Sequence, residues 1–153
     1  MFSIILVATD GSRESLVAVR AAAKEALLHK AVLHTVCAVN PGIVKSMFVS
    51  PHANAIIVDY DRINDFQAEE ANKALDYAEK EAADVGVSVI PHLMKGDPRE
   101  EILRCAEEIG ADCIVLGSTG KTGLKALLLG SVSSAVVTHA KISTMIIREK
   151  RKE

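Results

Sequence analysis

The stretch GSTGKTGLKALLLGS, residues 117–131, combines glycines and hydroxyl side chains at spacings that suit a phosphate. Glycines let a backbone approach a phosphate closely, and the first turn of a helix leaves N–H groups unpaired for an anion. Gly130 and Ser131 precede a short predicted helix, so the N–H groups of Val132 and Ser133 are the expected donors. The alternative is that the glycines only separate a strand from a helix, which explains a glycine–serine pair at a helix start less well.

Two other phosphate-binding motifs do not fit this chain. The GKT at residues 120–122 suggests a nucleotide triphosphatase loop, but that motif requires a glycine where Val115 stands. A dinucleotide fingerprint requires three glycines after the first strand, and the ATDG segment there supplies only one. Lys121 and Lys125 can add positive charge to the loop, or they can be solvated surface residues, which is the more common outcome for such lysines.

Short apolar segments rich in branched side chains alternate with longer segments whose apolar residues recur at helical spacing. The first predicted helix begins near Ser12, a suitable N-cap, and the second has Phe66, Ala74 and Ala78 on its inward face. This alternation predicts one α/β domain, residues 1–153, with an open five-stranded parallel sheet and helices on both faces. The predicted strands are 3–9, 31–39, 87–94, 112–116 and 144–148, and the predicted helices are 12–29, 61–85, 98–109 and 132–140.

The first and fourth predicted strands end in polar, glycine-containing sequence, ATDGS and LGSTG. In open α/β sheets ligands bind at the carboxyl ends of strands, where the strand order reverses. If these two strands are neighbours, Asp10 and Gly117 face each other across a crevice. Asp10 can then hold a ribose hydroxyl or cap the helix that begins near Ser12, and the sequence alone favours the cap.

The composition excludes several other classes of protein. Eighteen Lys and Arg residues against twenty Asp and Glu give a net charge of −2, which favours neither nucleic acid nor an anionic membrane. The first residues, MFSIILVATDG, lack the basic region of a signal peptide and the length of a membrane span, so we expect a cytoplasmic protein. Cys37, Cys105 and Cys113 lie in apolar segments without metal-ligand spacing and are interpreted as packing residues.

The segment from Asn40 to Tyr60 does not fit the alternation of strands and helices. It is long for a structureless loop and too apolar for a solvated linker. Two interpretations remain open: an arm that covers a site or contacts a partner, and a local turn packed on the core.

The glycine loop satisfies the pattern G-x2-G-x9-G-[ST] at every position, and with it the chain resembles the nucleotide-binding subgroup of the universal stress proteins. The likeness extends to ATDGS, to LHTV at residues 33–36 and to GDP at residues 96–98. It implies a Rossmann-like sheet in the order 3-2-1-4-5 that binds ATP, ADP or AMP, with Mg²⁺ held by the phosphates rather than by protein ligands. The site residues implied by the resemblance are Ala8, Thr9, Asp10, Thr35, Leu116, Gly117, Gly120, Gly130, Ser131, Val132 and Ser133.

The resemblance also sets expectations for assembly and activity. It implies a homodimer through the last strand, Ser143 to Arg148, and an edge strand does leave backbone groups unpaired. Thr35 stands where related proteins usually place a small apolar residue against adenine. The expected function is a non-catalytic stress or energy sensor, with a protein partner that the sequence does not identify. A slow ATPase or phosphotransfer enzyme is the alternative, and the intact glycine pattern argues against a nucleotide-free interaction module.

Overall fold

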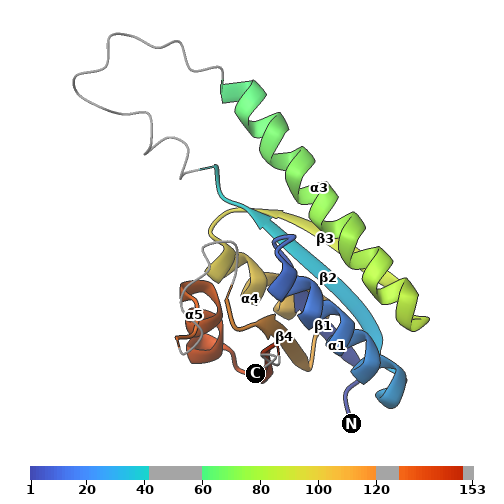
Figure 1. Ribbon diagram of the computed structural model, residues 1–153. Coiled ribbons are helices and arrows are strands. Elements are labelled where there is room, and N and C mark those ends of the chain that lie inside the picture. The colour runs from blue at the N-terminus through green and yellow to red at the C-terminus, as the bar shows by residue number, and fades with distance from the viewer. Residues whose placement is uncertain (42–59, 120–127, 150–153) are drawn as a thin grey trace, which may run out of the picture.

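The computed structural model describes residues 1–41, 60–119 and 128–149 (Figure 1). Most of the segment Asn40 to Tyr60, for which two interpretations were left open, lies outside the described residues. Gly120, Lys121 and Lys125 of the glycine loop also lie outside them.

Five parallel strands form one sheet in the order β3-β2-β1-β4-β5, which confirms the predicted open α/β architecture. β1 is central and pairs with β2 on one side and β4 on the other. The strand order therefore reverses at β1, and the two polar strand ends are neighbours, as expected. The strands are β1 (Ile4–Ala8), β2 (Val32–Val39), β3 (Val89–Lys95), β4 (Cys113–Gly117) and β5 (Ser143–Ile147).

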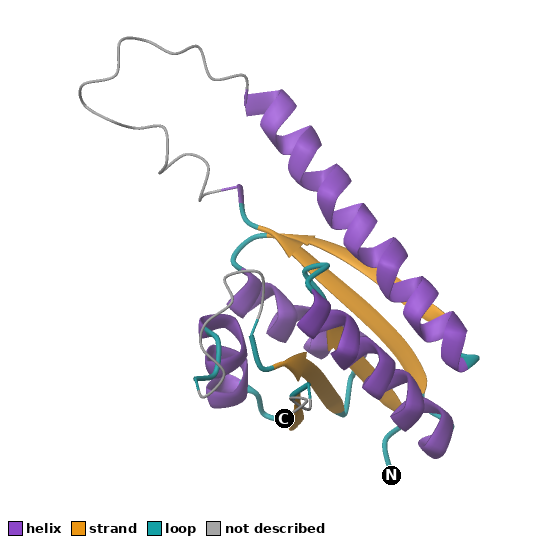
Figure 2. Ribbon diagram, viewed as in Figure 1, coloured by secondary structure: helices purple, strands orange, loops and turns teal. Residues whose placement is uncertain are grey.

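Helices cover both faces of the sheet (Figure 2). α1 (Arg13–His29) and α3 (Tyr60–Val85) pack on one face, and α4 (Pro98–Ile109) and α5 (Ser131–His139) pack on the other. Side chains of a strand alternate between faces, so β1 contributes to both cores. Ile5 and Val7 are buried with residues of α1 and α3, whereas Leu6 is buried with residues of α4 and α5.

The helix termini follow local sequence signals. Ser12 is the N-cap of α1, and its hydroxyl accepts a hydrogen bond from the Ser15 N–H group. Asp97 caps α4 directly before Pro98, whose missing N–H costs nothing in the first turn. Hydrogen bonds from the Arg99 side chain and backbone lower the pKa of the Asp97 carboxyl. None of the helices in the described part of the chain is both long and apolar enough to cross a membrane.

The expectation that Phe66 faces inward is wrong. Phe66 is 63% exposed, whereas Ala74 and Ala78 on the same helix are buried as predicted. The cause is helix length: the 26 residues of α3 span about 39 Å, and the eight residues of β2 span only about 26 Å. The first turns of α3 project beyond the carboxyl end of the sheet, where no strand lies beneath them (Figure 1).

Candidate functional site

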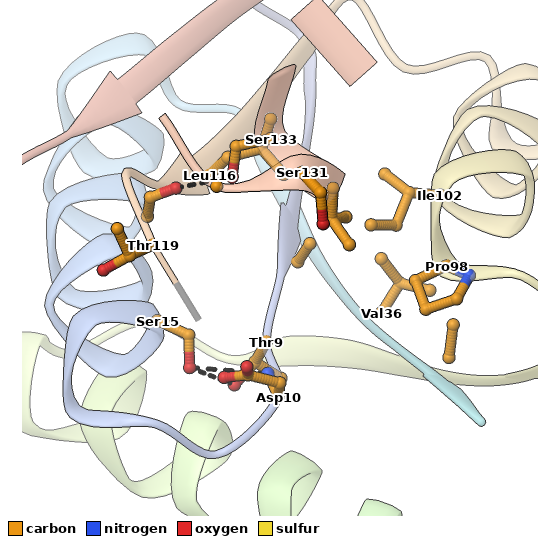
Figure 3. Close-up of a pocket in the computed structure, with 15 residues that line it drawn as sticks. Thr9, Asp10, Ser15, Val36, Pro98, Ile102, Leu116, Thr119, Ser131 and Ser133 are labelled. Atoms are coloured by element: carbon orange, nitrogen blue, oxygen red, sulfur yellow. Dashed lines mark hydrogen bonds between the residues drawn. The ribbon is translucent and has the colours of Figure 1, made fainter. Parts of the chain in front are cut away.

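A cavity of about 370 Å³ opens at the carboxyl ends of β1 and β4, where the strand order reverses. It is bounded by the loop after β1, the end of β2, the start of α4 and the start of α5 (Figure 3). Nine of the eleven predicted site residues line it: Ala8, Thr9, Asp10, Leu116, Gly117, Gly130, Ser131, Val132 and Ser133.

The floor beside β1 is a chain of hydroxyl groups. Ser15 Oγ donates to the Ser12 carbonyl oxygen at 2.9 Å, so its contact with Thr9 Oγ1 at 3.0 Å must be donated by Thr9 (Figure 3). Thr9 Oγ1 in turn accepts from the Gly11 N–H group at 3.2 Å. Thr9 and Ser15 are each 5% exposed, so these bonds satisfy hydroxyls that are largely shielded from water. The network fixes the shape of the loop that leaves β1.

The geometry partly decides between the two roles considered for Asp10, which were to cap α1 or to hold a ribose hydroxyl. The N-cap of α1 is Ser12, and Asp10 Oδ1 accepts from the Ser12 N–H group at 2.9 Å. Asp10 therefore braces the residue that caps the helix instead of capping it. Its side chain also lines the cavity, so a second role toward a ligand is compatible with this bond.

α5 begins at the cavity with an uncapped first turn. Its N-cap is Gly130, which has no side chain to accept a hydrogen bond from the turn. The N–H groups of Ser131, Val132 and Ser133 precede the first intrahelical bond, which Ser134 N donates to the Gly130 oxygen at 2.8 Å. Helix ends of this kind attract anions through these N–H groups and the helix dipole.

A buried hydrogen bond fixes this helix start against β4. Ser133 Oγ donates to the Gly117 carbonyl oxygen at 2.8 Å, and Ser133 is only 7% exposed. The Gly130 N–H group donates to the Ser118 oxygen at 2.8 Å. The Ser133 hydroxyl therefore positions the helix, and no described residue accepts a hydrogen bond from the backbone N–H group of Ser133, which can donate to a ligand.

The first glycine of the motif is required by packing. A Cβ on Gly117 would lie 3.0 Å from the Glu14 carbonyl oxygen and 3.2 Å from the Glu14 carbonyl carbon. Gly117 thus lets the first turn of α1 approach the end of β4 directly. The β1 loop and the described ends of the glycine loop line the same cavity.

The opposite wall of the cavity is apolar. Pro98 and Ile102 contribute from α4, and Val36 and Ala38 contribute from β2. Figure 3 shows Pro98 and Ile102 on one side of the cavity and Thr9, Asp10 and Ser15 on another. The cavity therefore has an apolar end and a polar end, which suits a ligand with the same division.

The structure does not bring Thr35 to this cavity. Thr35 is fully buried, and it lies on the strand face that carries Leu33, which packs in the core of α1 and α3. Val36 and Ala38 point to the cavity instead, because side chains one position apart on a strand face opposite ways. Thr35, which was predicted to contact a base, therefore does not line this cavity, and Val36 and Ala38 are the β2 residues that do. Gly120, the other predicted residue absent from the lining, lies outside the described residues.

Sequence reasoning missed six lining residues: Ser15, Val36, Ala38, Pro98, Ile102 and Thr119. Thr119 lies inside the glycine motif and could have been named from its position alone. Strand alternation applied from Val36 would have selected the correct residues of β2. The α4 residues carry no local signal, because only the tertiary fold places that helix beside the cavity.

Among the described residues that line the cavity, Asp10 is the only one with an ionisable side chain. No group of three or more His, Cys, Asp or Glu residues in the described ranges is arranged to hold a metal ion. The polar groups that the described lining offers to an anion at this end are therefore backbone N–H groups and hydroxyls.

The protein has an open parallel sheet with a cavity where the strand order reverses, next to the start of a helix. This arrangement belongs to the doubly wound α/β class, whose members bind ligands at this position. The chain belongs to the universal stress protein family, whose model matches residues 1–148. It is 33% identical over 153 residues to Universal stress protein MJ0531 of Methanocaldococcus jannaschii, covering 100% of this chain and 86% of that protein.

Solved structures have the same fold. The structure of hypothetical protein MJ0577 superposes with a TM-score of 0.80 at 28% identity, covering 99% of both chains. A universal stress protein in complex with cAMP superposes with a TM-score of 0.71 at 27% identity, covering 95% of this chain and 97% of that one.

Proposed function

We propose that the cavity binds an adenine nucleotide, ATP or the related ADP or AMP. The observation that carries this proposal is that one cavity joins an apolar wall to an uncapped helix start. A nucleotide has the same division between a flat, weakly polar base and an anionic phosphate chain. The cAMP complex of a related universal stress protein supports an adenine nucleotide as the ligand.

The end of β2 offers the base a backbone edge. The register of β1 with β2 ends at Ala8 and Val36, and Thr9 N donates to the Val36 oxygen at 2.9 Å. Backbone groups two residues apart on a strand point to the same side, so the N–H and C=O of Ala38 point past the end of β1. A donor and an acceptor there match the polar edge of adenine, and the apolar wall with Val36 and Ile102 would pack against the base.

The phosphates would be bound at the start of α5. The N–H groups of Val132 and Ser133 and the Ser131 hydroxyl would supply donors to the phosphates. Asp10, which lines the same cavity, would accept a hydrogen bond from a ribose hydroxyl. Mg²⁺ would be carried by the phosphate oxygens, since it retains water and needs few protein ligands. Gly120 would complete the glycine pattern.

We further propose that binding serves sensing rather than catalysis. Phosphoryl transfer needs a group that orients a water molecule and a cation that neutralises the transition state. The Thr9 and Ser15 hydroxyls are engaged with each other, and Asp10 braces Ser12, so these groups suit a rigid binding site. A ligand at a hundredfold excess over its Kd stabilises the folded protein that binds it by about 2.7 kcal/mol relative to the unfolded chain. A shift of this size can change the balance between two conformations or between monomer and dimer.

We propose that the protein acts in the cytoplasm as a homodimer whose two copies pair through β5. β5 is an edge strand of the sheet, and an edge leaves backbone groups available for pairing with a second copy. A further protein partner would read the nucleotide state.

Nucleotide release and turnover test this proposal together. The purified protein is denatured, released nucleotide is identified by chromatography, and ATP added to a stripped sample is followed for hours. The proposal predicts stoichiometric adenine nucleotide and ATP that persists. Sustained ADP production would favour the ATPase alternative, and failure of the stripped protein to bind any adenine nucleotide would contradict both.

A further inference from the structure

Two histidines on neighbouring strands contact each other outside the cavity. His34 on β2 and His92 on β3 have Nδ1 and Nε2 2.8 Å apart. The register pairs His34 with Ile90 and Val36 with His92, so the two imidazoles lie on one face of the sheet, two positions apart. Neither residue lines the nucleotide cavity. Both residues are only partly buried.

The ring geometry shows how the pair is held. The planes are 15° apart and the centroids 5.1 Å apart, so the two facing nitrogens lie close to the line between the rings. One nitrogen must donate a hydrogen and the other must accept it with its lone pair. The contact therefore requires at least one neutral imidazole. Burial first, and the neighbouring His92 second, lower the pKa of His34, which favours a neutral ring.

We propose that His34 and His92 form a two-imidazole binding site for a divalent transition metal such as Ni²⁺, Zn²⁺ or Cu²⁺. Imidazole nitrogens bind these ions at about 2.0–2.1 Å, so two nitrogens are about 2.9 Å apart in adjacent positions of a square or octahedral ion and about 3.3 Å apart on a tetrahedral ion such as Zn²⁺. The observed 2.8 Å is close to the first separation. The two nitrogens face each other along their hydrogen bond, so each partly exposed ring must turn by about 45° before both lone pairs meet at one ion.

The step needs no net loss of a proton from the neutral pair. The hydrogen shared between the rings moves to the other nitrogen of its own ring, and the freed lone pair takes its place on the metal. No third His, Cys, Asp or Glu joins the pair in the described part of the chain, so water completes the coordination. This makes the ion exchangeable, unlike the ion of a closed structural zinc site.

The proposal is tested by titrating nucleotide-free protein with Ni²⁺ in a calorimeter. The variants are His34→Gln, His92→Gln and the double variant, each checked for its fold by circular dichroism. His139→Gln is the control, because His139 is exposed on α5 and its Nδ1 contacts the Ala135 oxygen of its own helix and no other histidine among the described residues. The second imidazole binds intramolecularly, so each single variant should lose about a hundredfold in affinity, and the double variant little more.

Imidazole NMR of the unaltered protein keeps the test independent of the variants. Diamagnetic Zn²⁺ should shift the ring signals of His34 and His92 together at one stoichiometric equivalent. The proposal is overturned if the single variants bind Ni²⁺ as tightly as the control does. It is also overturned if the loss of binding free energy in the double variant equals the sum of the losses in the two single variants. It is also overturned if Zn²⁺ shifts other histidines first, for example His29, which lies 3.4 Å from the Glu25 carboxylate. Because nucleotide is absent throughout, the result does not depend on the proposed function.

Discussion

The hydroxyl of Ser133 donates a hydrogen bond of 2.8 Å to the carbonyl oxygen of Gly117, joining the start of α5 to the end of β4. The two residues are sixteen positions apart, at either end of the glycine loop. This bond sets where the N–H groups in the first turn of α5 point. The helix start is thus positioned by described residues outside residues 120–127.

Replacing Ser133 with alanine removes this bond and leaves the Gly117 oxygen without its partner in a buried place. We expect the free energy of unfolding to fall by about 1–3 kcal/mol. The affinity for adenine nucleotide should fall about tenfold, or about 1.4 kcal/mol, because the N–H groups lose their position. Urea unfolding and calorimetric titration measure the two effects. Ser134→Ala, an exposed neighbour on the same helix, is the control, and equal losses in both variants would contradict the account.

Gly117→Ala tests the packing of α1 against β4. The new Cβ would lie 3.0 Å from the Glu14 carbonyl oxygen, a backbone atom that cannot turn away. We expect a loss of about 1–3 kcal/mol in stability, with weaker nucleotide binding as the loops separate. Gly86→Ala is the comparison: its φ of +89° strains any side chain, but nothing lies within 4 Å and it is remote from the cavity. Nucleotide affinity that changes equally in both variants would refute the argument.

Thr35→Val should stabilise the protein or leave it unchanged, and it should leave nucleotide binding intact. Thr35 is fully buried, and its Oγ1 has no hydrogen-bond partner among the described residues. Removing an unsatisfied hydroxyl at nearly constant volume should gain about 1 kcal/mol. Thr9→Val is the matched control, because the Thr9 hydroxyl belongs to the network with Ser15 and its loss should destabilise. Thermal unfolding distinguishes the two variants. A loss of nucleotide affinity in Thr35→Val would show that Thr35 contacts the nucleotide after all.

The difference between Thr35 and Val36 shows what the sequence could and could not predict. Hydrophobic periodicity and turn residues located every described strand and helix, because those signals are local. The face of β2 that meets the cavity is the one on which α4 and α5 pack, and no local pattern reveals which face that is. Ile102 reaches the cavity only because α4 crosses that face of the sheet, so its role also depended on the tertiary structure.

The pKa of His34 gives a pH dependence of stability. The folded-state pKa lies below the ordinary 6.5, so the unfolded chain binds a proton more readily. The stability that neutral His34 contributes is fully present above about pH 6.5. It is lost as the pH falls from there through the folded-state pKa. His34→Gln should flatten this part of the profile measured by urea unfolding, whereas His139→Gln should not. A profile that stays steep in His34→Gln would assign the effect to another group.

The central claim, that α5 and the apolar wall bind one adenine nucleotide, is tested most directly by calorimetric titration of Mg²⁺–ATP into nucleotide-free protein. Gly130→Val places a side chain at the helix start, and Ser134→Ala alters the same helix away from the cavity. The account predicts one ATP bound per chain in the unaltered protein and in Ser134→Ala, and a loss of at least about tenfold in affinity in Gly130→Val. Unchanged binding in a folded Gly130→Val protein would show that the nucleotide binds elsewhere.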